Sequence, residues 1–301
     1  MGQAFPGFGE ACSALCALVW AFAVILFRKS GDHFPPVVLN LFKGLVGLSM
    51  MLVTLPLVGV DYVPAGTTAG DWGILLLSGT LGIGVADSLF FASLNRIGAG
   101  RFAVIDSLYS PSVIFWSLLL LSEPLGPMLP VAVALMGAAT VIGSWRPEEA
   151  TRAHDRRDAW TGILLGVAAV VIMAFGIVLA KPALDRTDPW WATTVRLVGG
   201  VAFLAVQGMT PAHRAATLAA LRPGPAWRVA IPGSVLGAWL SMLLWVFGMK
   251  YTYTTTASVL NQTTNMWVIL LAAVFLREPL RARHYLAVAL GFGAGWLATV
   301  A

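Results

Sequence analysis

The chain has 301 residues, of which 58% are hydrophobic, with only 19 basic and 14 acidic side chains and a mean hydropathy of +0.81. This composition lies outside the range of water-soluble domains. A helix that crosses about 30 Å of hydrocarbon needs roughly 20 apolar residues, so the chain is long enough for ten such helices joined by short loops. We therefore predict an all-α integral membrane protein whose surroundings are a lipid bilayer.

The net charge of +5 does not indicate a nucleic-acid partner, because the basic residues are scattered and form no stripe interleaved with aromatic residues. No Walker loop is present, and Cys12 and Cys16 have the character of small packing residues. The four histidines lie in or beside expected loops, without the His-Glu-x-x-His spacing of a zinc peptidase. The sequence therefore predicts no enzyme, no metal site, no catalytic residues and no cofactor.

Ten apolar stretches of spanning length follow one another along the chain, separated by proline, glycine and charged residues. Between the fifth and the sixth stretch, residues 146–158 contain eight charged side chains in thirteen positions. We therefore divide the chain into a first five-helix unit (1–145), a charged linker (146–158) and a second five-helix unit (159–301). The expected spans are 9–27, 36–58, 72–94, 101–121, 128–145, 160–180, 190–209, 227–248, 254–276 and 283–300.

The two units resemble each other in sequence. A shift of 155 residues places Glu123-Pro124-Leu125 on Glu278-Pro279-Leu280, and a shift of 153 places Pro36 on Pro189 and Lys43 on Arg196. The matches fall at the same helix phase in each pair, which indicates an internal duplication. An odd number of spans in each copy requires the second copy to cross the membrane upside down. The predicted fold is thus ten transmembrane helices in two inverted five-helix repeats.

The distribution of basic residues predicts the orientation. Of the 19 lysine and arginine residues, fourteen fall in loops on the side opposite to both termini. The positive-inside rule therefore predicts that both termini lie outside the cytoplasm. Tryptophan is enriched at the two membrane–water interfaces, so we expect four tryptophans near the ends of spans to lie there, namely Trp160, Trp190, Trp191 and Trp227.

Four ionisable residues fall inside the expected spans, where each costs roughly 2.5 to 3.5 kcal/mol on insertion scales and therefore needs a partner or a function. Lys43 lies at a depth that matches both Asp106 and Asp87, so an ion pair with either acid is expected, and either acid could carry a proton. In the second repeat Arg196 replaces Lys43, whereas Asn261 replaces Asp106 and Met242 replaces Asp87. Arg196 is thus available for a substrate carboxylate or a helix C-terminus, or else it snorkels to the surface.

Spans four and nine carry polar side chains that a lipid-facing helix would not tolerate. Span nine contains Asn261, Gln262 and Asn265, and span four contains Asp106 and Tyr109 ahead of Pro111, which removes a backbone hydrogen bond. We expect both helices to face a central substrate cavity. The predicted cavity residues, with tryptophans as apolar walls, are Trp20, Tyr109, Arg196, Trp239, Asn261, Gln262 and Asn265.

Trp20, Lys43, the Pro111 pattern of span four and the two Glu-Pro-Leu motifs resemble the EamA-type members of the drug/metabolite transporter superfamily, over essentially residues 9–300. The resemblance implies two inverted five-helix halves, with spans one, three, four, six, eight and nine around a central pathway and spans five and ten at the periphery. This family usually has arginine where Lys43 stands, and its members are often drawn with cytoplasmic termini, in conflict with the charge count.

Members that resemble this chain export small metabolites, and YddG-type amino-acid exporters are among them. We therefore expect a secondary transporter of the plasma (bacterial inner) membrane that works as a monomer, exports small molecules, most of all amino acids, and does so by alternating access between its halves. Alternatives are a multidrug carrier or a nucleotide-sugar-like carrier, although phosphorylated cargo would call for more cationic residues than Lys43 and Arg196. A passive channel is a further alternative, against which the inverted duplication argues.

Overall fold

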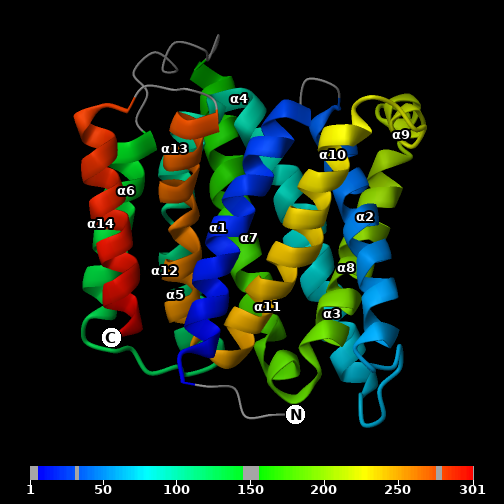
Figure 1. The fold of residues 1–301 in the computed structure, drawn as a ribbon, viewed down its shortest axis with the longest axis horizontal. Helices are drawn as coiled ribbons and strands as arrows, with labels where there is room; N and C mark the ends of the chain where they lie inside the picture. The colour runs from blue at the N-terminus through cyan, green and yellow to red at the C-terminus, as the bar shows by residue number, and fades with distance from the viewer. Residues whose placement is uncertain (1–5, 31–33, 145–155, 276–279, 301) are drawn as a thin grey trace.

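The computed structural model describes residues 6–30, 34–144, 156–275 and 280–300, and these residues form helices and turns without strands (Figure 1). The first half consists of α1 (Phe8–Ser30), α2 (Pro36–Leu57), α3 (Ala69–Gly79), the π-helix η1 (Thr80–Ala86), α4 (Asp87–Asp106), α5 (Tyr109–Leu120) and α6 (Leu129–Ser144). The second half consists of α7 (Arg156–Arg186), α8 (Pro189–Gly208), α9 (Arg214–Ala220), α10 (Trp227–Ser234), the π-helix η3 (Val235–Ser241), α11 (Met242–Tyr251), α12 (Thr254–Gln262), α13 (Thr264–Phe275) and α14 (Ala282–Thr299).

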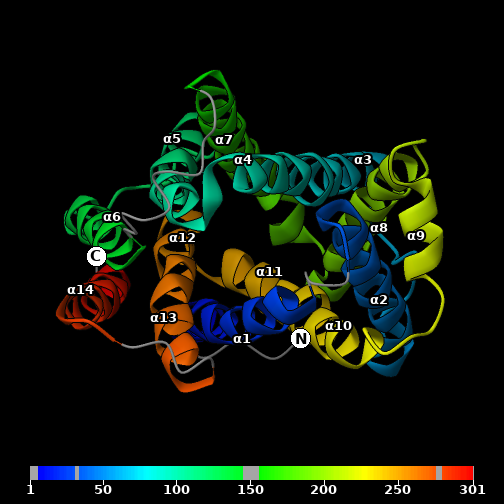
Figure 2. The same ribbon diagram turned by 90° about the horizontal axis from the view of Figure 1, so that it is seen from above.

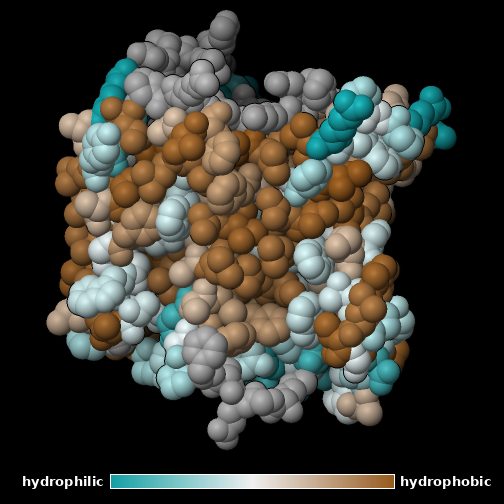
Figure 3. Space-filling view, viewed as in Figure 1, coloured by the Kyte–Doolittle hydropathy of each residue, from teal (hydrophilic) through white to brown (hydrophobic). Residues whose placement is uncertain are grey.

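The lengths and the apolar surface of these helices fit a membrane. Seven helical segments of the described ranges are long and apolar enough to cross a bilayer, and Val104–Leu120 and Leu129–Ser144 are shorter apolar helices. Together with α14 they account for the ten predicted spans. Hydrophobic side chains cover most of the face seen in Figure 3, with hydrophilic residues gathered toward its upper and lower edges. The prediction of a multi-pass, all-helical membrane protein is confirmed.

The boundary between the third and the fourth span differs from the prediction. The sequence led us to end span three at residue 94 and to begin span four at 101, yet α4 is one continuous helix from Asp87 to Asp106. Gly162 of α7 lies against Ile97, and Gly166 lies against both Ser93 and Ile105, so the helical path bends back on itself near Ile97. A helical connection satisfies its backbone N–H and C=O groups internally, so it can lie close to the hydrocarbon region.

The repeat register holds at the level of single elements. The π-helices η1 and η3 begin and end 155 residues apart, and so do α5 and α13, while α2 and α8 begin 153 residues apart at Pro36 and Pro189. Both chain ends are labelled on the lower side of Figure 1, and α9 lies at the opposite edge. Two ends on one side fit an even number of crossings, and with five spans in each matching half the second half is inverted relative to the first.

The first helix of each half packs against the other half. Helix α1 contacts α10, η3, α11, α12 and α13, whereas α7 contacts α3, η1, α4 and α5. We call α7 with α3, η1, α4 and α5 the first bundle, and α1 with α10, η3, α11, α12 and α13 the second bundle. Helices α2 and α8 pack against each other between them, and α6 pairs with α14 at one end of the molecule (Figure 2). The peripheral place expected for spans five and ten is thus observed.

Small residues allow α8 and α3 to approach closely. A Cβ atom added to Gly79 would overlap the backbone carbonyl of Arg196, and one added to Gly199 would overlap the backbone carbonyl of Leu76. In the symmetry-related crossing, a Cβ on Gly47 would overlap the backbone of Ala238. Because hydrocarbon provides no hydrophobic force between helices, such close backbone packing stabilises membrane bundles. The crossing of α8 over α3 also fixes the position of Arg196.

We predict that Gly79→Ala destabilises the fold by ~1–3 kcal/mol, the typical effect of overpacking. Gly73→Ala is the matched control, because Gly73 lies in the same helix and a Cβ there meets nothing within 4 Å. Alanine improves helix propensity, so the control should melt at or above the wild-type temperature. Thermal unfolding in detergent, followed by size exclusion, measures both. A Gly79→Ala protein as stable as the Gly73→Ala protein would refute the close-packing account.

Candidate substrate site

Spans four and nine are both interrupted near their middle, at equivalent positions of the repeat. Helix α4 ends at Asp106 and α5 begins at Tyr109, while α12 ends at Gln262 and α13 begins at Thr264. Hydroxyl groups at both interruptions bond back to the preceding turn, Ser107 to the Val104 carbonyl at 2.6 Å and Thr263 to the Leu260 carbonyl at 2.7 Å. Such side-chain bonds compete with the helical ladder. We call the two interruptions the twin breaks.

The break in span four lies just before Pro111. The sequence led us to expect a missing backbone hydrogen bond at Pro111, and this proline is the third residue of α5, in the first helical turn, where a missing N–H costs little. The break in span nine contains no proline at all. Local sequence therefore gave only a partial signal for the twin breaks.

The twin breaks face each other across the two bundles. The Gln262 side-chain amide donates to the Asp106 backbone carbonyl at 3.2 Å, and the Asn265 amide lies beside the Asp106 carboxyl group. Gln262 is buried, so its amide joins the helices rather than pointing into open space. Asn261 lies in the last turn of α12, and both atoms of its amide are buried without a hydrogen-bond partner among the described residues.

Arg196 lies in the middle of α8 and is only 1% exposed, so it does not snorkel to the surface. One of its terminal nitrogens donates to the Ser78 hydroxyl at 2.7 Å, and its guanidinium carbon lies 5.0 Å from the centre of the Trp245 ring. The Ser78 hydroxyl in turn donates to the Gly176 carbonyl at 2.5 Å. The Nε atom of Arg196 is buried without a partner, and no ion pair of the described ranges includes this arginine.

Tyr109 connects Arg196 with the twin breaks. Its side chain is 8% exposed and its hydroxyl group has no hydrogen-bond partner within the part of the chain that the structure describes. It lies beside Trp245 and within electrostatic reach of both Arg196 and Asp106. Arg196, Tyr109, Trp245 and Asp106 therefore form one group, which offers a cation, a hydroxyl, an aromatic face and an acid. We call it the central site.

Lys43 is paired with Asp87 and not with Asp106. Its ammonium nitrogen lies 3.1 Å from the Asp87 carboxylate, and the two side chains are 12% and 17% exposed. The same nitrogen lies 5.4 Å from the centre of the Trp20 ring, which adds a cation–π contact. This arrangement decides between the two pairings left open by the sequence. It compensates Lys43 and leaves Asp106 without a basic partner among the ion pairs of residues 6–30, 34–144, 156–275 and 280–300.

Trp239 serves packing more than it serves a cavity wall. Its indole nitrogen donates to the Thr54 hydroxyl at 3.1 Å, and its ring packs on the cluster around Leu41 and Ile83. It therefore fastens η3 to α2. The sequence analysis did not identify Ser78, which accepts a hydrogen bond from Arg196. A single serine within an apolar stretch gives no signal of its own, and its partner lies far away in the chain.

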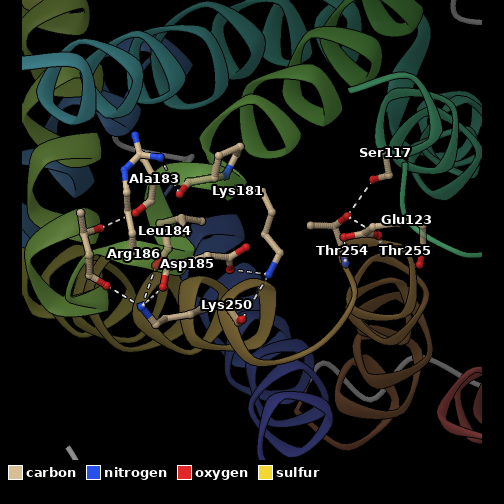
Figure 4. A network of polar contacts seen from close by, with 12 residues as sticks. Ser117, Glu123, Lys181, Ala183, Leu184, Asp185, Arg186, Lys250, Thr254 and Thr255 are labelled. Carbon is tan, nitrogen blue, oxygen red and sulfur yellow. Dashed lines mark hydrogen bonds and ion pairs between the residues drawn. The ribbon is translucent and has the colours of Figure 1, made fainter. Parts of the chain in front are cut away.

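A second polar network lies on the side of the termini (Figure 4). The Glu123 carboxylate accepts from the Thr254 hydroxyl at 2.8 Å and from the backbone N–H groups of Thr254 and Thr255 at 3.1 and 3.4 Å, so it caps α12. The backbone at Ser122 has a positive φ of 53° and turns Glu123 toward that helix. The Ser117 and Thr254 hydroxyls lie 2.7 Å apart.

Lys250 forms the other part of this network, at the C-terminus of α7. Its ammonium group donates to the backbone carbonyls of Leu184 at 2.7 Å and Thr187 at 2.5 Å, and Lys181 donates to the Lys250 carbonyl at 3.1 Å. A cation here complements the negative end of the helix. Glu123, Ser117 and Lys181 come from the first bundle or its continuation, whereas Thr254 and Lys250 come from the second. We call these contacts the terminus-side network, and they join the two bundles on one side of the membrane.

The cavity that the structure shows lies away from the central site. A cavity of about 250 Å³ lies between the connection from α5 to α6 and the start of α12, next to the terminus-side network and not at Arg196. Its lining residues are Pro124, Leu125, Gly126, Leu129, Tyr253, Thr255 and Thr256. Among the described residues, no three His, Cys, Asp or Glu side chains are grouped closely enough to hold a metal ion.

The chain is similar in sequence to a family of transporters and to two curated bacterial proteins. The model of the EamA-like transporter family matches residues 7–145 and again residues 160–300. Protein PecM of Dickeya dadantii (strain 3937) is 28% identical over 228 residues, which are 74% of this chain and 72% of PecM. The uncharacterized transporter YvbV of Bacillus subtilis (strain 168) is 25% identical over 195 residues, which are 65% of this chain and 61% of YvbV.

A solved crystal structure shares the fold. It superimposes with a TM-score of 0.79 and covers 97% of this chain and 96% of its own chain, at 17% sequence identity. At this level of identity the likeness concerns the fold alone. The double match of one family model agrees with the internal duplication, and the narrower YddG-type resemblance stays a prediction.

We predict that Asp87→Asn destabilises the protein by roughly 3–5 kcal/mol, because it leaves the Lys43 ammonium group uncompensated between helices. The double variant Lys43→Met with Asp87→Asn should recover most of that loss. Asp158→Asn is the control, because Asp158 pairs with Arg96 at the exposed end of α7, where ion pairs contribute at most about 1 kcal/mol. Melting temperatures in detergent test the set. Equal effects of the two single variants would show that the Lys43–Asp87 pair is solvated and unimportant.

Proposed function

Since the chain belongs to the EamA-like transporter family, and is a multi-pass membrane transporter, we propose that it exports small amphipathic metabolites with a carboxylate group, amino acids foremost, across the cytoplasmic membrane. The observation that carries the proposal is the Arg196 guanidinium. It is buried, it has no acidic partner among the described ion pairs, and its Nε atom is unpaired.

A buried cation without an anion is costly, and a substrate carboxylate would supply that anion. Arginine suits this role because its planar fork binds carboxylates through two parallel hydrogen bonds. Ser78 and Trp245 already hold the guanidinium from two sides, so its orientation is fixed before a ligand binds. Tyr109 adds a free hydroxyl, and the Trp245 face suits an apolar or aromatic side chain of the cargo.

Alternating access is the second part of the proposal. The central site lies between the first and the second bundle, and the terminus-side network links these bundles on the side of the chain ends. We assign this conformation as closed toward the termini. With the termini outside the cytoplasm, as the loop charges predict, it is closed to the exterior, which is the loading state of an exporter. Transport then requires the terminus-side network to open.

We predict that Arg196→Gln raises the KM for amino-acid uptake into proteoliposomes by at least about tenfold, because a buried charge partner of the carboxylate is lost. Radiolabelled L-leucine and L-phenylalanine are suitable probes. The matching amines without a carboxylate should be affected much less, which separates loss of recognition from misfolding. Arg222→Gln, at an exposed arginine after α9, is the matched control and should leave uptake unchanged. Equal KM values for wild type and Arg196→Gln would contradict the carboxylate assignment.

A disulfide across the terminus-side network tests alternating access. In the protein with Ser117→Cys and Thr254→Cys the two sulfur atoms come within bonding reach, because the hydroxyls they replace lie 2.7 Å apart. Oxidation should stop uptake, and a reducing agent should restore it, while each single cysteine variant stays active under both conditions. Undiminished, non-saturating flux through the oxidised protein would instead indicate a passive channel.

A further inference from the structure

We propose that the twin breaks form a binding site for a monovalent cation, either the ammonium group of the transported metabolite or a free alkali ion. If the ligand is the ammonium group of a metabolite, the inference rests on the proposed transport function. If the ligand is a free alkali ion, it does not. The cation site lies at Asp106, in a different part of the central site from Arg196, where we place the substrate carboxylate.

Three sources of negative potential meet at the twin breaks. Helix α4 ends there at Asp106 and α12 ends at Gln262, and neither helix has a basic residue in its last turn. The carbonyl groups of each last turn carry partial negative charge, which the N-termini of α5 and α13 directly after the breaks offset in part. The two ends are joined directly, because the Gln262 amide donates to the Asp106 backbone carbonyl. The Asp106 carboxyl group adds to these ends instead of opposing them.

None of the ion pairs among the described residues includes Asp106. The two intramembrane cations are otherwise engaged, Lys43 with Asp87 and Arg196 with Ser78 and Trp245. The neutral Asn265 amide is the side chain beside the Asp106 carboxyl group. An acid at the end of its own helix, facing a second helix end, inside a membrane span, is an arrangement that a bound cation would stabilise.

Buried polar atoms without a hydrogen-bond partner among the described residues lie within a few residues of both twin breaks. Both atoms of the Asn261 amide are buried without a partner, as are the hydroxyl groups of Ser110 and Tyr109, of which Ser110 is fully buried. Ser110 and Tyr109 open α5 directly after the first break, and Asn261 lies in the last turn before the second. Oxygen ligands from hydroxyl, amide and carbonyl groups suit alkali and ammonium ions. Discontinuous helices of transporters bind cations with half-helix C-termini of this kind.

The repeat explains why one half carries the acid. Asn261 occupies the position of Asp106 in the second half, so the pair of breaks holds a single carboxylate and not two. One carboxylate with two helix ends matches one positive charge, whereas two carboxylates would repel each other or require a divalent ion. Asparagine at the equivalent position also shows that this fold accepts the amide in such a break.

The experiment compares wild type, Asp106→Asn and Asn261→Leu as purified full-length proteins in nanodiscs. In the first arm, melting temperatures are measured in sodium, lithium and potassium chloride against choline chloride at constant ionic strength. In the second arm, calorimetry compares L-leucine with 4-methylpentanoate, which keeps the carboxylate and lacks the ammonium group. Asp158→Asn, at an exposed acid of α7, is the control for a change of one charge.

Stabilisation of wild type by an alkali ion, lost in Asp106→Asn, supports the site with the free ion as its ligand. Binding of L-leucine at least about tenfold tighter than 4-methylpentanoate, with the difference lost in Asp106→Asn, supports it with the ammonium group as its ligand. Asn261→Leu should raise the melting temperature in choline chloride, because it removes an unpaired amide, and should weaken cation binding in whichever arm responds.

No cation dependence in either arm, or a dependence that Asp106→Asn retains, overturns the proposal. These outcomes are separable from a failure of the transport proposal. If uptake persists without any preference for sodium or for the ammonium group, the transporter stands and the cation site falls. If no tested metabolite is transported while sodium stabilises wild type and not Asp106→Asn, the cation site stands alone.

Discussion

The absence of water from the hydrocarbon core is the constraint on which this structure depends, because every polar group within it needs a partner inside the protein or a ligand. Most such groups here have one. Lys43 has Asp87, Glu123 caps α12, and Lys250 caps α7. Arg196 and Asp106, which have no ion-pair partner among the described residues, lie between the two bundles. The charged groups that lack an ion-pair partner therefore lie at the proposed substrate site.

The first helix of each half packs on the other half, and this determines which helices can move together. Because α1 packs on the second half and α7 on the first, neither sequence half is a moving unit, and the two bundles each contain helices from both. The close crossings of α2 and α8 lie between them and hold glycine where backbones touch. In a tightly packed protein such interfaces switch between discrete arrangements. The terminus-side network stabilises one of these arrangements, in which the central site is closed toward the termini.

Hydropathy and the repeat predicted the ten spans, the duplication and the inversion, since these depend on composition along the chain. Contacts between distant segments could not be predicted. The partner of Arg196 is Ser78, in another helix, and depth alone did not decide between Asp87 and Asp106 for Lys43. Trp191 illustrates the same limit: it was expected at the membrane interface, but it is 1% exposed and its indole donates to the Tyr62 carbonyl. The two π-helices have no sequence pattern that we could identify, and at the proline-free break at Thr263 the hydroxyl group is only a partial local signal.

A map of the protein in nanodiscs with a bound amino acid, obtained by electron cryomicroscopy, tests the central claim most directly. The account predicts ligand density between the bundles, with its carboxylate on the Arg196 guanidinium and its opposite end directed toward Asp106. Density in the cavity formed by Pro124, Leu129 and Thr256, with Arg196 still unpaired, would contradict it.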